Sequence, residues 1–311
     1  MKIVALAGGV GGAKLADGLA QILPSADLTV VVNTGDDFEH WGLSISPDVD
    51  TVCYMLAGLA NPETGWGRLA ETFHALENIQ LLGGPGWFHI GDKDLATHLE
   101  RTRLLRSGQS LSQITQHFCQ VWGIRHTILP MSNQPVRTMV NTRHDGELPF
   151  QEYFVHRNCE PEVRGFRFAG IDSAQPAPGV MKSIEKADAV VFCPSNPWVS
   201  IDPILALPGL RSALSTKTVL AVSPIIGGET VKGPAAKMYT ELGIKPSALS
   251  VALHYKGLLS GFILDIVDNA LAEEFTISTT ITQTLMKTQD DRRRLAQDVL
   301  HLVQTLQTVV Q

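Results

Sequence analysis

Residues 1–37 read MKIVALAGGVGGAKLADGLAQILPSADLTVVVNTGDD, and this stretch decides the fold. Its apolar run from Lys2 to Ala7 predicts a buried strand, and the helical spacing of apolar residues from Lys14 to Leu23 predicts a helix. The β-branched run from Leu28 to Val32 predicts a second strand. Two strands joined by one crossover helix form a right-handed βαβ unit, so both strands belong to a parallel sheet.

Two later segments repeat this pattern of a strand followed by a loop. The run from Ala189 to Cys193 precedes the loop PSNPW, and the run from Thr218 to Val222 precedes the loop SPIIGG. Ligands of open parallel sheets bind beyond the carboxyl ends of the strands, so we expect these loops to meet the N-terminal glycines around one crevice. The expected fold is α/β, a Rossmann-like, doubly wound and mostly parallel sheet within a single domain spanning residues 1–311.

The other segments are expected to surround this sheet. A mainly helical cap is predicted at about 52–125, with helices from Leu95 to Arg106 and from Leu111 to Trp122. Residues of about 127–170 are typical of short antiparallel strands. Apolar residues at helical spacing from Asp290 to Val310 predict a packing helix at the end of the chain.

The composition favours a packed enzyme over a nucleic-acid-binding or membrane protein. Of the 311 residues, 44% are hydrophobic and 18% charged, which is ordinary for a globular protein with a full core. The net charge of -6 provides no positive field for a polyanion. The cysteines form no C-x-x-C pair, and no apolar run reaches the roughly 20 residues of a membrane span. We expect reduced thiols, small-molecule substrates and a cytoplasmic location, without nucleic-acid or membrane partners.

The sequence GGVGGAK at residues 8–14 follows the first strand and opens the first helix. Bare backbone N–H groups and the helix dipole favour a phosphate at such a position. The sequence is not a Walker A motif, because it contains no Gly-Lys followed by Ser or Thr, and it does not match G-x-G-x-x-G in register. A phosphate-binding loop is favoured over a mere tight turn, with its ligand left open. Its candidate residues are Gly8, Gly9, Gly11, Gly12 and Lys14.

Four aspartates, Asp36, Asp37, Asp48 and Asp50, lie within fifteen residues after the second strand. Four acids in loops are costly unless a cation or hydrogen-bond donors use them, and their oxygen atoms suit magnesium better than zinc. In the alternative interpretation, Asp36 and Asp37 cap a turn beside Gly35, and Asp48 starts a helix after a proline.

Polar residues also gather in GDKDLATHLERTRLLRSG, which places Asp92 and Asp94 at a helix start with Lys93 and His98 nearby. Capping explains one of the two aspartates. His98 is a candidate ligand or base, although a lone helical histidine is more often packed or solvated.

The loops after the later strands supply small polar groups that suit hydrogen bonds to a base, ribose or phosphate. The lysine among them could reach a diphosphate, or could be merely solvated. These candidates are Ser195, Asn196, Ser223, Gly227 and Lys237.

Taken together, these segments resemble the 2-phospho-L-lactate transferases of coenzyme F-420 biosynthesis, within the gluconeogenesis-factor-like group of Rossmann-like proteins. The resemblance spans nearly the whole chain, in the family's order and at similar spacing. Many relatives have GGTGTPK where this chain has GGVGGAK, so no threonine contact to phosphate is expected here, but the backbone cradle is kept. The resemblance rests on GGVGGAKLADGL, VVNTGDD, ISPDVDTVCY, GDKDLATH, LPMS, EPEVRG, PSNPWVSIDPILALPG, VSPIIGG and GPAAK.

This resemblance implies transfer of a 2-phospholactyl or phosphoenolpyruvyl group from a guanosine diphosphate conjugate to the deazaflavin Fo. The reaction would use Mg²⁺, release GMP and give coenzyme F-420-0 or its dehydro form, and a homodimer is also implied. The glycine loop and the two later loops would bind the guanosine diphosphate. Catalysis would belong to Asp48 and Asp50, metal binding to Asp37, Asp48 and Asp50, and Fo binding to Asp50, Lys93 and Trp87.

The deazaflavin needs an apolar, aromatic slot, and aromatic side chains in the predicted cap are candidates to stack on it. In the plainer interpretation they form the core of the cap. They are Trp66, Trp87, Phe88 and His89.

Two other classes of function stay open. A nucleotide-sugar-binding regulator of the same fold would keep the glycine loop but need no acceptor site, and the segments DVDT and GDKDLATH argue against it. An NAD-dependent oxidoreductase would show G-x-G-x-x-G and an acidic residue at the end of the second strand. That strand ends in Asn33 and Thr34, which disfavours ribose capture there.

Overall fold

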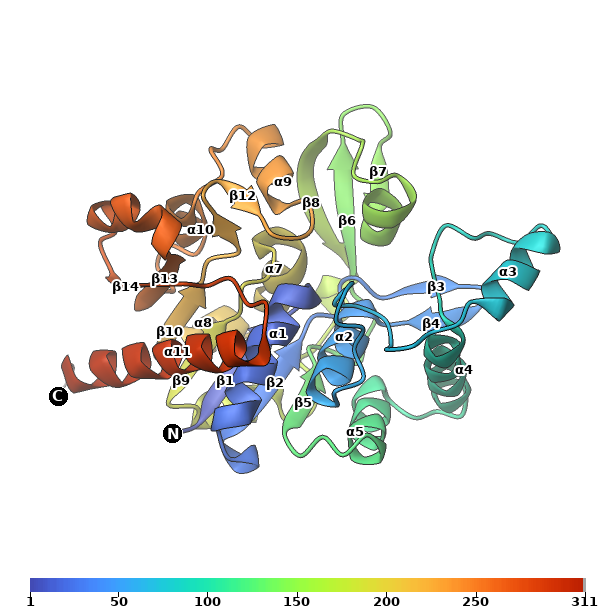
Figure 1. Cartoon of the computed structure of the whole chain (residues 1–311), viewed down its shortest axis with the longest axis horizontal. Coiled ribbons are helices and arrows are strands. Elements are labelled where there is room, and N and C mark those ends of the chain that lie inside the picture. The colour runs from blue at the N-terminus through green and yellow to red at the C-terminus, as the bar shows by residue number, and fades with distance from the viewer. Residues whose placement is uncertain (310–311) are drawn as a thin grey trace.

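The computed structural model describes residues 1–309, and within this range seven strands form one parallel sheet (Figure 1). The sheet confirms the predicted α/β class. Strand β1 lies inside it, with Ile3 level with Leu28 on one neighbour and with Ala189 on the other. The order is β14-β13-β10-β9-β1-β2-β5. Their bounds are β1 Ile3–Ala7, β2 Leu28–Val32, β5 Thr127–Pro130, β9 Ala189–Phe192, β10 Thr218–Val222, β13 Gly261–Asp265 and β14 Ser278–Thr282.

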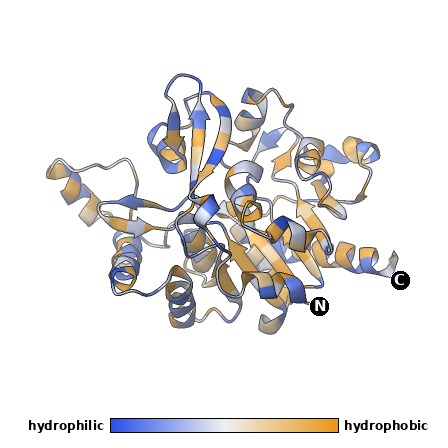
Figure 2. Ribbon diagram, turned by 180° about the vertical axis from the view of Figure 1, so that it is seen from behind, coloured by the Kyte–Doolittle hydropathy of each residue, from blue (hydrophilic) through white to orange (hydrophobic). Residues whose placement is uncertain are grey.

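Helices cover both faces of the sheet because alternate side chains of each buried strand point to opposite sides. Ile3 and Ala5 pack on the face covered by α1, α2 and α11, whereas Val4 and Leu6 pack on the face covered by α6, α8 and α10. Figure 2 shows hydrophobic residues concentrated in these central strands. The helices are α1 Gly9–Ile22, α2 Pro47–Leu56, α6 Val180–Lys186, α7 Asp202–Leu205, α8 Leu210–Leu214, α9 Ala235–Glu241, α10 Ala248–His254 and α11 Gln289–Val309.

The segment between α2 and β5 is mostly helical and contains α3 (His74–Leu81), α4 (Asp92–Arg106) and α5 (Leu111–Val121). The hairpin of β3 (Phe38–His40) and β4 (Leu43–Ile45) runs outward from the sheet toward α3 (Figure 1). Strand β4 packs against α4, and α2 begins two residues after β4 ends. The hairpin therefore brings α2 and α4 together.

The prediction for residues 127–170 was wrong in its first strand. β5 pairs parallel with β2 as an edge of the main sheet, because a four-residue run ending in proline carries no signal of its direction. The rest of that segment is antiparallel as predicted, in a separate three-stranded sheet of order β7-β6-β8. Its strands are β6 Arg137–Thr142, β7 Glu147–Pro149 and β8 Val163–Ala169.

Other boundaries differ by a few residues. Helix α1 begins at Gly9 and not at Lys14, because the glycines form its first turn, and the predicted last residue of α11, Val310, lies outside the described residues. No helix within residues 1–309 has the length and apolar character needed to cross a bilayer. All four cysteines are free thiols. The remaining short elements are β11 Ile225–Ile226, β12 Glu229–Thr230, and 3₁₀ or π segments at Ser25–Asp27, Glu152–His156, Ile171–Ser173, Pro197–Ile201 and Ile266–Glu274.

Candidate functional site

The loops that follow β1 and β9 meet at the start of α1. Ser195 Oγ donates to the carbonyl of Gly8 at 2.8 Å and accepts from its N–H at 3.1 Å. A Cβ on Gly8 would lie 2.5 Å from Asp48 Oδ2, and one on Gly12 would lie 2.5 Å from Ser195 Oγ. Gly9 differs, because it has φ +62° and nothing within 4 Å of its missing Cβ. The glycines therefore allow close packing on one side of the helix start and leave its other side open.

Asp48, in the first turn of α2, is bound to this helix start. Its Oδ1 accepts from the N–H of Gly9 at 2.7 Å, and its Oδ2 accepts from Asn33 Nδ2 at 2.9 Å. The same nitrogen lies 3.0 Å from Asp36 Oδ1 and 3.1 Å from the carbonyl of Val199. An amide nitrogen has two protons for these three acceptor oxygens, so they cannot each receive a full hydrogen bond from it.

Burial makes ionisation of these carboxyls costly. Burial raises the pKa of Asp48 to about 6. Burial also raises the pKa of Asp36 well above its usual value, and the charge of Asp48 raises it further. Burial also raises the pKa of Asp37 to about 7, although Ser46 Oγ donates to its Oδ2 at 2.8 Å. The second oxygen of Asp37, Oδ1, is buried without a hydrogen-bond partner.

Asp36, Asp37 and Asp48 offer carboxylate oxygens to a hard divalent cation, but among the described residues the three ligand atoms found within 4.8 Å of one another belong to Asp50, Asp94 and His98. Within residues 1–309, no lysine, arginine or histidine side chain forms an ion pair with Asp36, Asp37 or Asp48. Carboxylate oxygens are the ligands that Mg²⁺ prefers, and the unpartnered Oδ1 of Asp37 is available to one. The backbone turn predicted for Asp36 and Asp37 is also present, since Asp37 N donates to Thr34 O at 3.2 Å.

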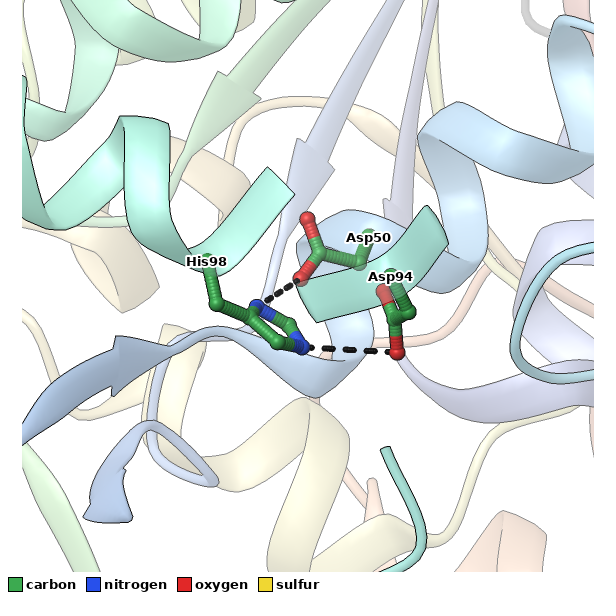
Figure 3. A group of neighbouring side chains, drawn as sticks. All are labelled: Asp50, Asp94 and His98. Atoms are coloured by element: carbon green, nitrogen blue, oxygen red, sulfur yellow. Dashed lines mark ion pairs between the residues drawn. The ribbon is translucent and has the colours of Figure 1, made fainter. Parts of the chain in front are cut away.

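Asp50 contacts helix α4 instead (Figure 3). His98 lies between two carboxylates, with Nδ1 3.7 Å from Asp50 Oδ2 and Nε2 3.3 Å from Asp94 Oδ2. Arg101 Nη2 donates to Asp50 Oδ1, and Tyr54 donates to Asp94 at 2.7 Å. Burial raises the pKa of Asp50, which the charge of Arg101 opposes. Burial acts on Asp94 too, but contacts with His98 and Tyr54 outweigh it and lower the pKa.

The lysines predicted from the sequence are bound to other parts of the chain. Lys14 Nζ donates to Met286 O at 2.7 Å, and burial followed by the charges of Arg292 and Lys232 lowers its pKa. Lys93 Nζ donates to the carbonyls of Leu69 and Ala70. Lys237 forms an ion pair with Glu241 beside the Tyr153 ring, away from the carboxyl cluster.

The remaining predicted loop residues mainly form hydrogen bonds that involve backbone groups. Asn196 Oδ1 accepts from Trp198 N at 3.1 Å, and Ser223 Oγ donates to Ile225 O at 2.7 Å. Gly227 N donates to the carboxylate of Asp268 at 3.0 Å. Asp92 accepts from the backbone N–H groups of residues 74 and 75, so it caps the start of α3.

The four aromatic residues of the predicted slot are divided between two places. Trp66 and His89 line a cavity of about 310 Å³, whose wall also includes Phe73 and Asp94. Trp87 instead stacks on His156, with ring centroids 5.1 Å apart. Its other ring neighbours are Phe38, His40 and Phe88.

This cavity adjoins the start of α1. A Cβ on Gly65 would lie 2.5 Å from a methyl group of Val10, the third residue of the glycine loop. Lys232 Nζ donates to Thr64 O at 2.5 Å, which joins the segment between β12 and α9 to the same cavity wall. The segment 64–66 therefore contacts the start of α1 at Val10 and also lines the aromatic cavity.

Sequence reasoning missed Asn33 and Arg101 as site residues. For Arg101 a signal was available, because Asp94, His98 and Arg101 are spaced i, i+4 and i+7 and so share one face of α4. For Asn33, local pattern contained no comparable signal, since its partner Val199 is 166 residues away.

Comparison with known proteins identifies the family of the chain. The profile of the family described as 2-phospho-L-lactate transferase CofD matches residues 3–308. A phosphoenolpyruvate transferase of Streptomyces griseus is 46% identical over 281 residues, covering 88% of each chain. A 2-phospho-L-lactate transferase of Methanosarcina acetivorans is 40% identical over 309 residues, covering 98% of this chain and all of the relative.

The fold also occurs in a solved structure. A crystallised UPF0052-family protein of Bacillus halodurans superposes with a TM-score of 0.64 over 96% of this chain and 99% of its own, at 16% identity. That likeness concerns the fold alone. With the family profile matching nearly the whole chain and relatives of 40% identity or more matching most of it, this protein belongs to the 2-phospho-L-lactate transferase CofD family and is a transferase.

Proposed function

We propose that the protein transfers a phosphorylated three-carbon acid, 2-phospholactate or phosphoenolpyruvate, from a guanosine diphosphate conjugate to the primary hydroxyl of the deazaflavin Fo. The hydroxyl oxygen attacks the distal phosphorus and forms a P–O bond. The bond from that phosphorus to GMP breaks with its electron pair going to the GMP oxygen, and the hydroxyl proton passes to water. The observation that carries this proposal is the contact of buried Asp48 with the N–H of Gly9 beside an aromatic cavity.

The start of α1 supports binding of the donor diphosphate. The N–H of Gly9 already donates to Asp48, but the following N–H groups of the first turn and the helix dipole favour an anion, and the open space at Gly9 allows close approach. The charge of Lys232 contributes to lowering the pKa of Lys14, so both lysines are close enough to add positive charge near the start of α1. The loops containing Ser195 and Ser223 would bind the nucleoside part.

Asp37 and Asp48, together with Asp36, would hold Mg²⁺, and Asp50 would orient the acceptor. When bound, the ion would supply positive charge that offsets the charge developing on the phosphate oxygen of the departing GMP. The chain's own contribution is to keep these carboxylates buried and fixed. Asn33 orients Asp36 and Asp48, and Ser46 orients Asp37.

The aromatic cavity supports binding of a flat heteroaromatic acceptor. Trp66 and Phe73 are 47% and 37% exposed, which leaves ring surface free for stacking. Lys93 borders this cavity through its bonds to Leu69 and Ala70. Trp87 is held in its own aromatic cluster, so we assign it a smaller part in the acceptor site than Trp66.

A mass-spectrometric assay tests the proposal. Purified protein, Fo and Mg²⁺ are mixed with synthetic lactyl- or enolpyruvyl-diphosphoguanosine, and GMP and the phosphodiester product are followed. Product from one donor is expected and identifies the three-carbon acid. Absence of product from both donors, with nucleotide-sugar binding retained, would instead support the regulatory function.

Matched variants test the acceptor cavity. Trp66→Ala is expected to raise the KM for Fo, whereas Trp87→Ala should raise it less, because its ring is already stacked on His156. Equal effects of the two variants would contradict the assignment of the cavity. Light scattering of the purified protein tests the homodimer that we also propose.

A further inference from the structure

Asp48 and Asp50 point in different directions although they are two residues apart. An α-helix turns by about 200° over two residues, so these side chains leave α2 on opposite sides. Asp48 contacts Gly9 and Asn33, whereas Asp50 contacts Arg101 of α4. One ion would therefore have difficulty using both carboxylates.

Arg101 is the most enclosed charged residue on the Asp50 side, with an exposed fraction of 1%. Its Nη2 donates to Asp50 Oδ1, and its Nη1 lies 3.1 Å from His98 Nδ1 and 3.3 Å from Ser44 O. The ring centroid of Phe118 lies 5.9 Å from its Cζ. The guanidinium is thus fixed from several directions, and it stays protonated at all ordinary pH values.

Asp50, Asp94 and His98 would otherwise be a plausible metal site. One ligand atom from each lies within 4.8 Å of the others, and a set of two carboxylates and an imidazole suits Mn²⁺ or Zn²⁺. The guanidinium takes the position of a cation in this group. Because an arginine can only donate, His98 Nδ1 accepts from Arg101, so the ring proton is on Nε2, which lies 3.3 Å from Asp94 Oδ2 and has no hydrogen-bond partner. Neither ring nitrogen is then free to bind a metal.

We propose that Arg101 is a positioning residue that serves as the permanent counter-cation of Asp50 and confines the divalent cation to the side of Asp48. His98 and Asp94 hold Arg101 in place. The proposal rests on the Mg²⁺ site of the proposed function, but it predicts where an ion binds and not whether a product forms.

Mn²⁺ alone, added to the full chain, tests this proposal by pulsed electron paramagnetic resonance, which detects a histidine nitrogen bound to the ion. The wild type should show no ¹⁴N coupling from a ligand histidine. Arg101→Gln should bind additional Mn²⁺ with such a coupling, because Asp50 and His98 lose their cation. Arg101→Lys should behave as the wild type, and the coupling should vanish in the double variant Arg101→Gln/His98→Gln.

A second pair of variants tests where the ion binds even if Arg101→Gln does not fold. Asp48→Asn should weaken Mn²⁺ binding at least about tenfold, whereas Asp50→Asn should change it by less than about threefold. Histidine coupling in the wild type, or equal loss of Mn²⁺ affinity in both aspartate variants, would overturn the proposal. Neither readout depends on transferase activity, so a failed product assay would leave this result standing on its own.

Discussion

A single amide nitrogen, Nδ2 of Asn33, lies between the carboxylates of Asp36 and Asp48. Replacing Asn33 with Ala removes the donor and leaves two buried acids facing each other. We expect a loss of about 1–3 kcal/mol in the free energy of unfolding at neutral pH, because buried acceptors lose their partner. Urea unfolding measures this loss. Asn78→Ala, at an exposed position of α3, should change it little, and equal effects would contradict the assigned role.

The carboxyl cluster also makes stability depend on pH. The pKa values of Asp37 and Asp48, about 7 and about 6, exceed the ordinary value of 3.8, so between these values the folded protein binds more protons than the unfolded chain. This contribution to stability is therefore lost as pH rises through that interval. Without metal, thermal unfolding should occur at lower temperature at about pH 8 than at about pH 5, and Asp37→Asn should reduce the difference. An unchanged slope in that variant would refute the explanation.

Mg²⁺ should act in the opposite direction. The ion binds ionised carboxylates, so its stabilising effect should grow as pH rises through the same interval, and binding should release protons. Melting curves with Mg²⁺ or a chelator across that interval measure the effect. A Mg²⁺ effect that does not vary with pH would mean that other ligands hold the ion.

At the scale of elements, the start of α1 depends on Gly11. A Cβ there would collide with the carbonyl of Pro194 in the loop after β9. Gly11→Ala should move α1 from that loop, lower stability by about 1–3 kcal/mol and weaken binding of the donor nucleotide. Calorimetric titration with GDP and urea unfolding measure these effects. Gly165→Ala is the matched control, because its added methyl group meets nothing within 4 Å, and it should leave both unchanged.

The elements that carry the site were largely predictable, whereas their mutual contacts were not. β1, α1 and β2 follow from local pattern, because buried strands and an amphipathic helix have distinct periods. β14 was missed, since its sequence STTIT is mostly polar and half-buried. The bond of Gly8 to Ser195 joins residues 187 positions apart, and only folding brings them together.

Adjacency in the sequence did not show which partners two neighbouring aspartates have. Asp48 and Asp50 are two residues apart in the motif DVDT, but helical geometry sends them to different partners. The shared metal site that the sequence suggested for them stays a prediction. Helix periodicity was sufficient to separate the pair once the helix start at Pro47 was known.

At the scale of the whole molecule, α11 packs along α1, the helix whose start carries the glycine loop (Figure 1). Gly18 allows this contact, because a Cβ there would collide with the backbone carbonyl of Arg292. Gly18→Ala should therefore lower the free energy of unfolding by about 1–3 kcal/mol, despite the higher helix propensity of alanine. Urea unfolding tests this. A gain in stability would show that the two helices can separate at no cost.

The contact of Val10 with Gly65, and the bond of Lys232 to Thr64, have a consequence for how two substrates are handled. If the donor binds at the start of α1 as proposed, we expect it to act through Val10 on the wall of the neighbouring aromatic cavity and so to change the affinity for the second substrate. Thermodynamic linkage makes this effect mutual: the acceptor must alter donor affinity by the same factor. The binding of the two ligands would then be coupled through the loop that contains Thr64 and Gly65, which lies between the two sites.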